Sequence, residues 1–120
     1  MKQYKITENN ITYDIIEYSD GGKYWYLNGK LHREDGPADE SLSGNRRWYK
    51  NGLLHRDDGP AIIYYNGERV WFKNGLYHRD NGPAIELYNG SKEYWYNGNH
   101  LKNINSDEDL KRYIKLLSIS

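Results

Sequence analysis

Short stretches of the chain alternate between hydrophobic and polar positions, a pattern that predicts β-strands with two different faces. Ile62 and Tyr64 share one face of such a stretch, and Ile63 lies on the other. The predicted strands are residues 11–19, 22–27, 46–50, 61–65, 68–73, 84–88 and 92–96. Equivalent positions recur 23 residues apart: Ile16, Ile62 and Ile85 on one face, and Glu17, Glu40, Ile63 and Glu86 on the face expected to meet solvent.

Five features share the 23-residue period, which identifies a tandem repeat. They are a tryptophan, an Asn-Gly pair, a His-Arg pair, a Gly-Pro-Ala triplet and a further glycine. The copies begin at Trp25, Trp48 and Trp71; at Asn28, Asn51, Asn74 and Asn97; at His32, His55 and His78; at Gly36, Gly59 and Gly82; and at Gly21, Gly44, Gly67 and Gly90. The last glycine series follows Asp20, Asn66 and Asn89 in three copies, and Asx-Gly favours type I′ hairpin turns there. Residues 28–36 and their copies are expected to be longer connections.

The two ends of the chain depart from the repeat, as capping units do. We expect a half repeat at 11–21, full repeats at 22–44, 45–67 and 68–90, and a degenerate unit at 91–104. Ser106, followed by three acidic residues, predicts the N-cap of a helix over 106–118 that closes the end of the sheet. The predicted fold class is mainly β: one elongated, twisted antiparallel sheet of tandem hairpins with a C-terminal capping helix, in a single domain of residues 1–120.

Composition narrows the possible functions. Seventeen basic and 17 acidic residues leave no net charge, which removes the usual electrostatic case for DNA or an anionic membrane. The chain has four Trp, 13 Tyr and one Phe, so aromatic side chains supply much of the core. It has no cysteine, and it contains no apolar run of membrane-spanning length. We expect a cytoplasmic protein without a cofactor.

The spacing Trp48-x-x-Asn51-Gly52-x-x-His55 resembles the MORN repeat, and the resemblance extends from about Ile11 to His100. It implies 23-residue β-hairpins stacked into an elongated sheet. Arg33, Arg56 and Arg79 stand where MORN units usually have glycine, and Gly-Pro-Ala is foreign to that motif. The His-Arg-Glu/Asp-Asp-Gly-Pro-Ala form more closely resembles repeats of uncharacterised tailed-phage and giant-virus proteins, which implies a viral origin.

The His-Arg pairs allow two interpretations. In the structural one, Asp35, Asp58 and Asn81 cap the Gly-Pro turns while His and Arg bridge neighbouring loops. In the other, a row of guanidinium groups binds a phosphate, a nucleotide or an acidic partner. Metal binding is excluded, because equivalent histidines lie about 10 Å apart when each repeat adds two strands. No catalytic constellation stands out. The candidate binding residues of these rows are His32, Arg33, His55, Arg56, His78 and Arg79.

Two further groups are candidates for binding. The repeating tryptophans are interpreted as core, with base stacking as the alternative, whereas Tyr65 and Tyr88 lie on the face away from Ile62 and Ile85 and suit a contact surface. Residues 39–47 replace the usual apolar strand and Asx-Gly turn with polar residues. Asp39, Arg46 and Arg47 in this irregular unit are therefore suspected of function, with ordinary repeat decay as the alternative.

These observations favour a binding module over an enzyme. The leading hypothesis is a phage accessory protein that acts in the host cytoplasm and binds, and inhibits, a host protein such as a defence factor. The alternative is a nucleotide-binding, nucleic-acid-binding or ligand-sequestering protein that uses the Arg and Tyr rows. A phosphoester hydrolase is the least favoured. The segment Ile11–Tyr18 is expected to be an exposed edge strand through which a homodimer can form.

Overall fold

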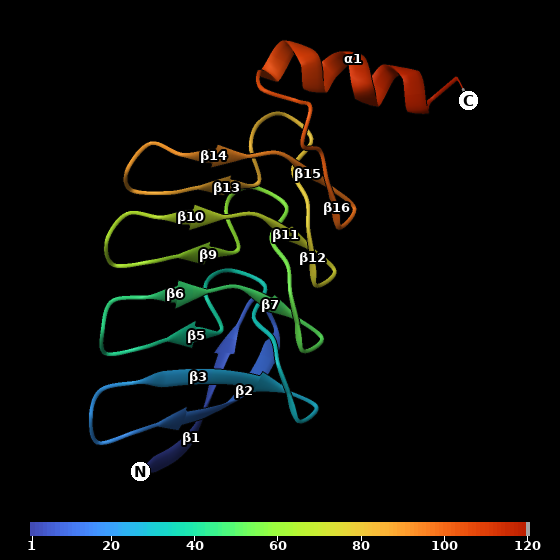
Figure 1. The fold of residues 1–120 in the computed structure, drawn as a ribbon. Coiled ribbons are helices and arrows are strands. Elements are labelled where there is room, and N and C mark those ends of the chain that lie inside the picture. Colours follow the sequence, from blue (N-terminus) through green and yellow to red (C-terminus); the bar gives the residue numbers. More distant parts are fainter. Residues whose placement is uncertain (120) are drawn as a thin grey trace.

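The protein is a stack of β-hairpins with one helix at its C-terminal end (Figure 1). The structure, a computed structural model, describes residues 1–119. Its principal extents are 49 × 33 × 19 Å, so the hairpins form an elongated and thin body. This architecture confirms the predicted fold class, a long antiparallel sheet of hairpins followed by a helix.

Ten strands make up the main sheet, in the order β1-β2-β3-β5-β6-β9-β10-β13-β14, with β4 paired to β3. Their bounds are β1 (Lys2–Glu8), β2 (Ile11–Glu17), β3 (Lys23–Leu27), β4 (Lys30–Leu31), β5 (Asp39–Glu40), β6 (Arg46–Arg47), β9 (Ile62–Ile63), β10 (Arg69–Val70), β13 (Ile85–Glu86) and β14 (Lys92–Glu93). Three smaller hairpins lie on the other side of the stack in Figure 1: β7 (Tyr49–Lys50) with β8 (Leu53–Leu54), β11 (Phe72–Lys73) with β12 (Leu76–Tyr77), and β15 (Trp95–Tyr96) with β16 (Asn99–His100).

Each repeat therefore contains two hairpins, where the sequence predicted one hairpin and a long connection. The Asn-Gly pair closes the smaller hairpin: Asn51 has φ 51° and Gly52 has φ 80°. Positive φ at both central residues defines a type I′ turn. The predicted type I′ turns at Asp20, Asn66 and Asn89 are wrong, because positive φ there is confined to the glycine that follows each. Their side chains instead accept a hydrogen bond from the backbone N–H two residues later.

The predicted strand over residues 46–50 is interrupted at Trp48, which separates β6 from β7. The N–H of Trp48 donates to the carbonyl of Ala61 at 2.8 Å, and the chain then leaves the main sheet for the smaller hairpin. The same bond joins Trp71 to Ala84 in the next repeat. Ala61 and Ala84, from the Gly-Pro-Ala triplets, have no exposed surface, so each triplet places a small residue where the two hairpins meet.

The sheet begins with a hairpin that the sequence did not predict. β1 pairs with β2 over seven residues, through a turn in which Asn9 and Asn10 both have positive φ. β2 also pairs with β3 on its other side. The segment Ile11–Tyr18 is therefore internal, and its expected role as the exposed edge strand is wrong. The edge strand at this end of the sheet is β1.

The largest apolar cluster lies under this first hairpin. Tyr13, Ile15, Trp25 and Ala38 are buried together, with Tyr4 and Ile6 packed against them. Further along the stack the buried residues are fewer, and Ile62 and Val70 oppose one another on neighbouring strands. The positions expected to meet solvent, Glu17, Glu40, Ile63 and Glu86, are half-buried. The apolar residues of the sheet thus lie on both of its faces, and each face is only partly covered.

The helix α1 (Asp107–Leu117) lies at the β14 end of the stack (Figure 1). Ser106 is its N-cap, and the Ser106 side chain accepts a hydrogen bond from the backbone N–H of Asp109. Leu110 is buried, and the hydroxyl of Tyr94 donates to Asp107 at 2.7 Å. Burial and this hydrogen bond raise the pKa of Tyr94 to about 12. Among the described residues, no helix is long and apolar enough to cross a membrane.

Candidate binding surface

The histidines of the His-Arg pairs connect consecutive repeats. Nδ1 of His32 accepts a hydrogen bond from the backbone N–H of Asn51 at 2.9 Å, and Nε2 lies 2.8 Å from Glu34. An acceptor Nδ1 carries no proton, so the ring is the tautomer whose Nε2–H donates to the carboxylate. His55 and His78 make the same two contacts one and two repeats later, with Asn74 and Asp57, and with Asn97 and Asp80. Each histidine thereby binds the Asn-Gly turn of the following repeat.

The guanidinium groups of these arginines lie over the tryptophan rings. The guanidinium carbon of Arg56 is 4.0 Å from the centre of the Trp48 ring, and Nη1 donates to the carbonyl of Pro60 at 3.1 Å. Asp58 accepts from its Nε at 3.0 Å. Arg79 repeats the arrangement on Trp71, with Pro83 and Asn81 as acceptors and Glu86 as a further partner. Only about a fifth of each side chain is exposed, 22% for both Arg56 and Arg79.

Arg33 is more buried than its copies, and the first hairpin supplies its carboxylate partner. Glu8 accepts hydrogen bonds from Nε and Nη2 of Arg33 at 3.1 and 2.8 Å, a bidentate pair. Hydrogen bonds from Arg33 lower the pKa of Glu8. Asn9, at the tip of the same hairpin, donates to Asp35. Arg33 lies 3.6 Å from the centre of the Trp25 ring and is 15% exposed, so the β1–β2 hairpin closes the start of the arginine row.

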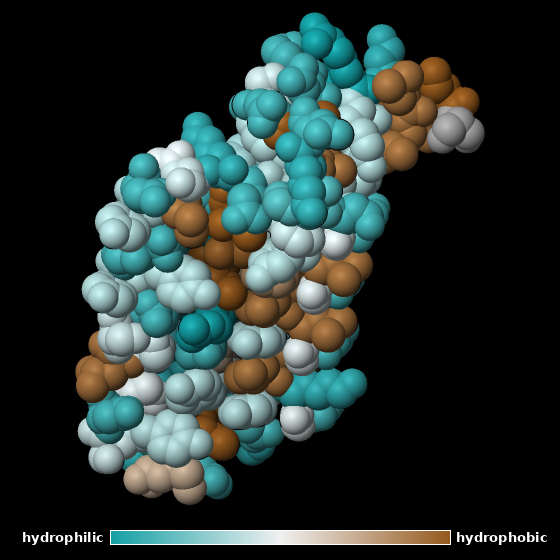
Figure 2. All heavy atoms as spheres, in the orientation of Figure 1, coloured by the Kyte–Doolittle hydropathy of each residue, from teal (hydrophilic) through white to brown (hydrophobic). Residues whose placement is uncertain are grey.

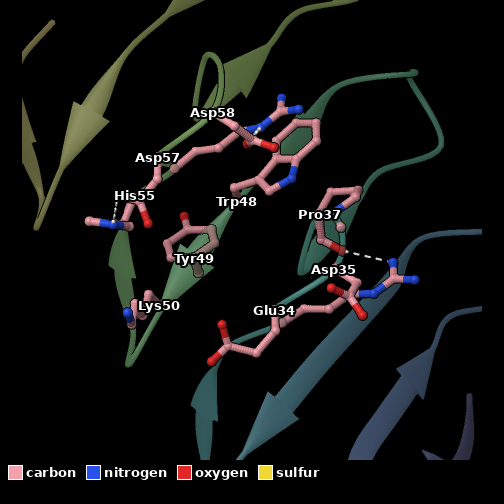
Figure 3. Close-up of a pocket in the computed structure, with 12 residues that line it drawn as sticks. Glu34, Asp35, Pro37, Trp48, Tyr49, Lys50, His55, Asp57 and Asp58 are labelled. Carbon is pink, nitrogen blue, oxygen red and sulfur yellow. Dashed lines mark hydrogen bonds and ion pairs between the residues drawn. The ribbon is translucent and has the colours of Figure 1, made fainter. Parts of the chain in front are cut away.

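Two hollows lie between consecutive Gly-Pro loops, with volumes of about 550 and 480 Å³. Figure 3 shows the first, where Trp48 and Tyr49 lie between Glu34 and Asp35 on one loop and Asp57 and Asp58 on the next. The side chains of Asp57 and Asp58 are 79% and 86% exposed, whereas the arginines are held against the tryptophans. The outer surface of this edge therefore carries carboxylates. Among residues 1–119, no group of three His, Asp or Glu side chains could hold a metal ion.

The irregular unit places a carboxylate in an apolar row. Asp39 occupies the position of Ile62 and is 8% exposed. Arg47 donates to its Oδ2 at 3.4 Å, while Oδ1 is buried and has no partner among the described residues. Burial raises the pKa of Asp39, and Arg47 opposes that shift. Arg46, on the other face, is exposed.

Large apolar side chains project from the turns of the main sheet. Tyr65 and Tyr88 are 77% and 75% exposed, and Leu42 at the equivalent position of the irregular unit is 69% exposed. We call these three residues the turn row. Leu42 packs over Gly21 of the preceding turn, and Tyr65 packs over Gly44. Sequence reasoning found the two tyrosines but missed Leu42, although its 23-residue spacing from Tyr65 was a usable signal.

Sequence reasoning missed two further rows. Leu53 and Leu76, at the tips of the smaller hairpins, are 48% and 50% exposed. A basic residue stands at the same position of every unit: Lys23, Arg46, Arg69 and Lys92. Arg69 pairs with Glu86 at 2.8 Å, whereas Arg46 and Lys92 form no ion pair within the described residues. Figure 2 shows the apolar residues gathered near the middle of the sheet, around β10 and β13, and along the smaller hairpins, among more hydrophilic ones.

Comparison with known proteins adds no relative to this picture. No family model, curated protein or solved structure matches the chain. The similarity to MORN repeats thus remains a resemblance of motif and period.

Proposed function

We propose that this protein is a non-enzymatic binding module that contacts another protein through the turn row. The observation that carries the proposal is the exposure of Leu42, Tyr65 and Tyr88, between 69% and 77%, at equivalent positions of three consecutive repeats. Two strands separate each pair, which spaces the side chains about 10 Å apart. Exposed tyrosines on a rigid sheet suit a protein interface, because they offer large contact area at low conformational cost.

The internal contacts of the His-Arg rows support this assignment. Arg33, Arg56 and Arg79 stack on tryptophans and donate to carbonyl groups of the fold. The histidines accept hydrogen bonds from the next repeat. A ligand that recruited these side chains would have to break the hydrogen bonds by which the histidines join the repeats, or the contacts by which the arginines hold each Gly-Pro loop against its tryptophan. A partner that binds the turn row breaks no such contacts, because the side chains of this row project from the fold.

The specific form of the proposal is a phage accessory protein that binds, and inhibits, a host protein such as a defence factor. It rests on the resemblance of the His-Arg-Asp-Asp-Gly-Pro-Ala repeat, residues 55–61, to repeats of tailed-phage and giant-virus proteins. The equal numbers of acidic and basic residues suit a partner surface that is apolar rather than strongly charged.

A nucleotide-binding or nucleic-acid-binding role is the second candidate, and the basic row is the observation that favours it. Arg46 and Lys92 are exposed on the same hairpins as the turn row, whose tyrosine rings could stack on bases. Binding of this kind weakens steeply as salt concentration rises, because counterions are released from the phosphates. Binding that is insensitive to salt would exclude it.

The test of the proposal compares two double variants in affinity capture from a bacterial host lysate, quantified by mass spectrometry. Tyr65→Ser with Tyr88→Ser removes both tyrosines of the turn row, and Leu53→Ser with Leu76→Ser is the matched control on the smaller hairpins. We expect a protein captured by the wild type to be lost with the first variant and retained with the second. Equal capture by all three proteins would contradict the turn row as the contact surface.

A further inference from the structure

The strand β1 leaves one edge of the sheet open. β1 pairs with β2 along its whole length of seven residues and stands at the end of the sheet order. Gln3, Lys5 and Thr7 are exposed, while Tyr4 and Ile6 are half-buried against the core cluster. An edge of this length presents a row of unpaired backbone groups that can pair with another strand.

The turn of the first hairpin determines which backbone groups point outward. Asn9 and Asn10 form a two-residue turn, in which the flanking residues Glu8 and Ile11 are the hydrogen-bonded pair. Hydrogen-bonded and non-hydrogen-bonded pairs alternate along an antiparallel ladder. The N–H and C=O groups of Gln3, Lys5 and Thr7 therefore point away from β2. Three residues thus offer their backbone groups to a partner strand.

The sequence of β1 is complementary to itself in antiparallel order. When two copies pair about Lys5, Gln3 lies opposite Thr7 of the second copy, and all the outward backbone groups of both strands are used. Tyr4 then lies opposite Ile6, on the face that continues the core. Lys2 lies opposite Glu8, which adds an ion pair of opposite charges at each end. A shift by one residue would place Tyr4 opposite the exposed Lys5 and break this match.

Charges on β1 are compatible with this register. The two Lys5 side chains lie next to one another at the two-fold axis. Their charges are offset, because Nζ of each lies 2.5 Å from Oδ1 of Asp14 in its own chain. The Glu8 carboxylate is 26% exposed beside Arg33, so a lysine of the second copy can reach it. Lys2 is exposed and has no ion pair among the described residues. The edge therefore has a free cation for each accessible carboxylate.

We propose that β1 pairs with β1 of a second copy of this chain, which joins two sheets into one across a two-fold axis. The new ladder contains about six backbone hydrogen bonds between the chains. The helix α1 occupies the other end of the stack, so growth stops at two copies instead of continuing into a fibre. This surface is separate from the turn row, and the inference does not depend on the proposed function.

A single cysteine tests the register, because the chain has none of its own. Under mild oxidation, Lys5→Cys should form an interchain disulfide, since residue 5 faces its own copy across the axis. Gln3→Cys is the matched control, because the two copies of residue 3 are four residues out of register, roughly 13 Å apart. A disulfide that forms faster at residue 3 than at residue 5 would overturn this register.

Native mass spectrometry and light scattering of the full chain test the dimer itself. We expect a species of twice the 14.2 kDa chain mass. Lys5→Pro, which removes an outward N–H, should be monomeric, while Lys5→Ala stays dimeric. Lys2→Glu breaks no ion pair within the chain and should weaken the dimer about tenfold, by placing like charges opposite Glu8 of the second copy. A monomeric wild type overturns the proposal, as does a dimer unaffected by both Lys5→Pro and Lys2→Glu. The Tyr65→Ser, Tyr88→Ser variant should dimerise like the wild type.

Discussion

At the residue scale, the repeated histidine is a structural link whose partner lies in the next unit. His32 is 4% exposed, and the Asn51 N–H that it accepts from belongs to a turn 19 residues further on. The sequence offered bridging of neighbouring loops as one interpretation of the His-Arg pair, with anion binding as the other. It could not decide between these roles, because both need the same residue types. The choice among these roles needed the positions of the ring nitrogens and of the guanidinium groups.

Replacing the histidine should separate the repeats that it joins. We expect His32→Ala to lower the free energy of unfolding by about 1–3 kcal/mol, because the part-buried Asn51 N–H loses its acceptor. Urea denaturation measures the change. His100→Ala is the control, since His100 contacts a carboxylate, Glu93, at 3.6 Å instead of a turn N–H. Equal losses in the two variants would contradict the linking role.

Asp39 and Arg47 are a polar pair in an otherwise apolar row, and replacing both should stabilise the fold. Asp39→Ile with Arg47→Val reproduces Ile62 and Val70, which oppose one another in the next repeat as Asp39 and Arg47 do here. We expect a gain of about 1–4 kcal/mol, because a buried ion pair with an unsatisfied oxygen gives way to apolar packing. Thermal unfolding measures it. A loss of stability would show that the pair is needed for folding.

The stability contributed by Asp39 should depend on pH. Burial raises the pKa of Asp39 above its usual value of 3.8, so the folded protein holds this proton more tightly than the unfolded chain. The stabilisation that comes from this tighter proton binding is fully present below pH 3.8. It is lost as pH rises through the pKa of Asp39 in the folded protein. The free energy of unfolding of Asp39→Asn minus that of the wild type should therefore rise from about pH 4 toward neutrality. A difference that falls over this range would contradict the assignment.

At the scale of the element, turn chemistry explains both what the sequence predicted and what it missed. Glycines at fixed spacing marked the turns of the main hairpins, and Ser106 marked the start of α1. The smaller hairpins were missed because their first strands, β7, β11 and β15, were taken as continuations of β6, β10 and β14. Their second strands, of two residues each, lie in the segments that were interpreted as long connections. The strand β1 was missed because only Tyr4 and Ile6 are apolar in a polar segment. The type I′ turn was assigned to the Asx-Gly pairs of the main hairpins, but it occurs at the Asn-Gly pairs of the smaller hairpins. The two kinds of pair could not be told apart because they carry the same sequence signal.

The Gly-Pro loop depends on its glycine for close contact, not for a special φ. A Cβ on Gly59 would lie 2.9 Å from the guanidinium carbon of Arg56. We expect Gly59→Ala to cost about 1–3 kcal/mol in the free energy of unfolding, because the methyl group displaces Arg56 from Trp48 and Pro60.

A double-mutant cycle identifies the cause of that cost. In an Arg56→Ala background, adding Gly59→Ala should have much less effect, since the clashing group is gone. Urea denaturation measures the free energy of unfolding in both backgrounds. If Gly59→Ala lowers it equally in both, contact with Arg56 is not what requires glycine at position 59.

At the scale of the whole molecule, the two edges of the stack have different roles. The histidine row joins the repeats along one edge, and each arginine holds the Gly-Pro loop of its own unit against a tryptophan. The carboxylate partners of both rows form the outer surface of this edge. The turn row projects from the hairpin turns at 69–77% exposure and takes part in none of the His-Arg contacts. The 23-residue period predicted that such rows exist. Alternation placed Tyr65 and Tyr88 on an outer face, and both are exposed. Whether the arginine row is free could not be predicted, because a repeated residue has the same sequence signature whether it binds within the fold or binds a partner.

The most direct test of this division is native mass spectrometry of the protein purified from a bacterial host, wild type beside the Tyr65→Ser, Tyr88→Ser variant. It detects bound molecules of every class in one spectrum. We expect a stoichiometric protein partner on the wild type that is absent from the variant. A retained nucleotide or oligonucleotide, or a protein partner that remains on the variant, would contradict it.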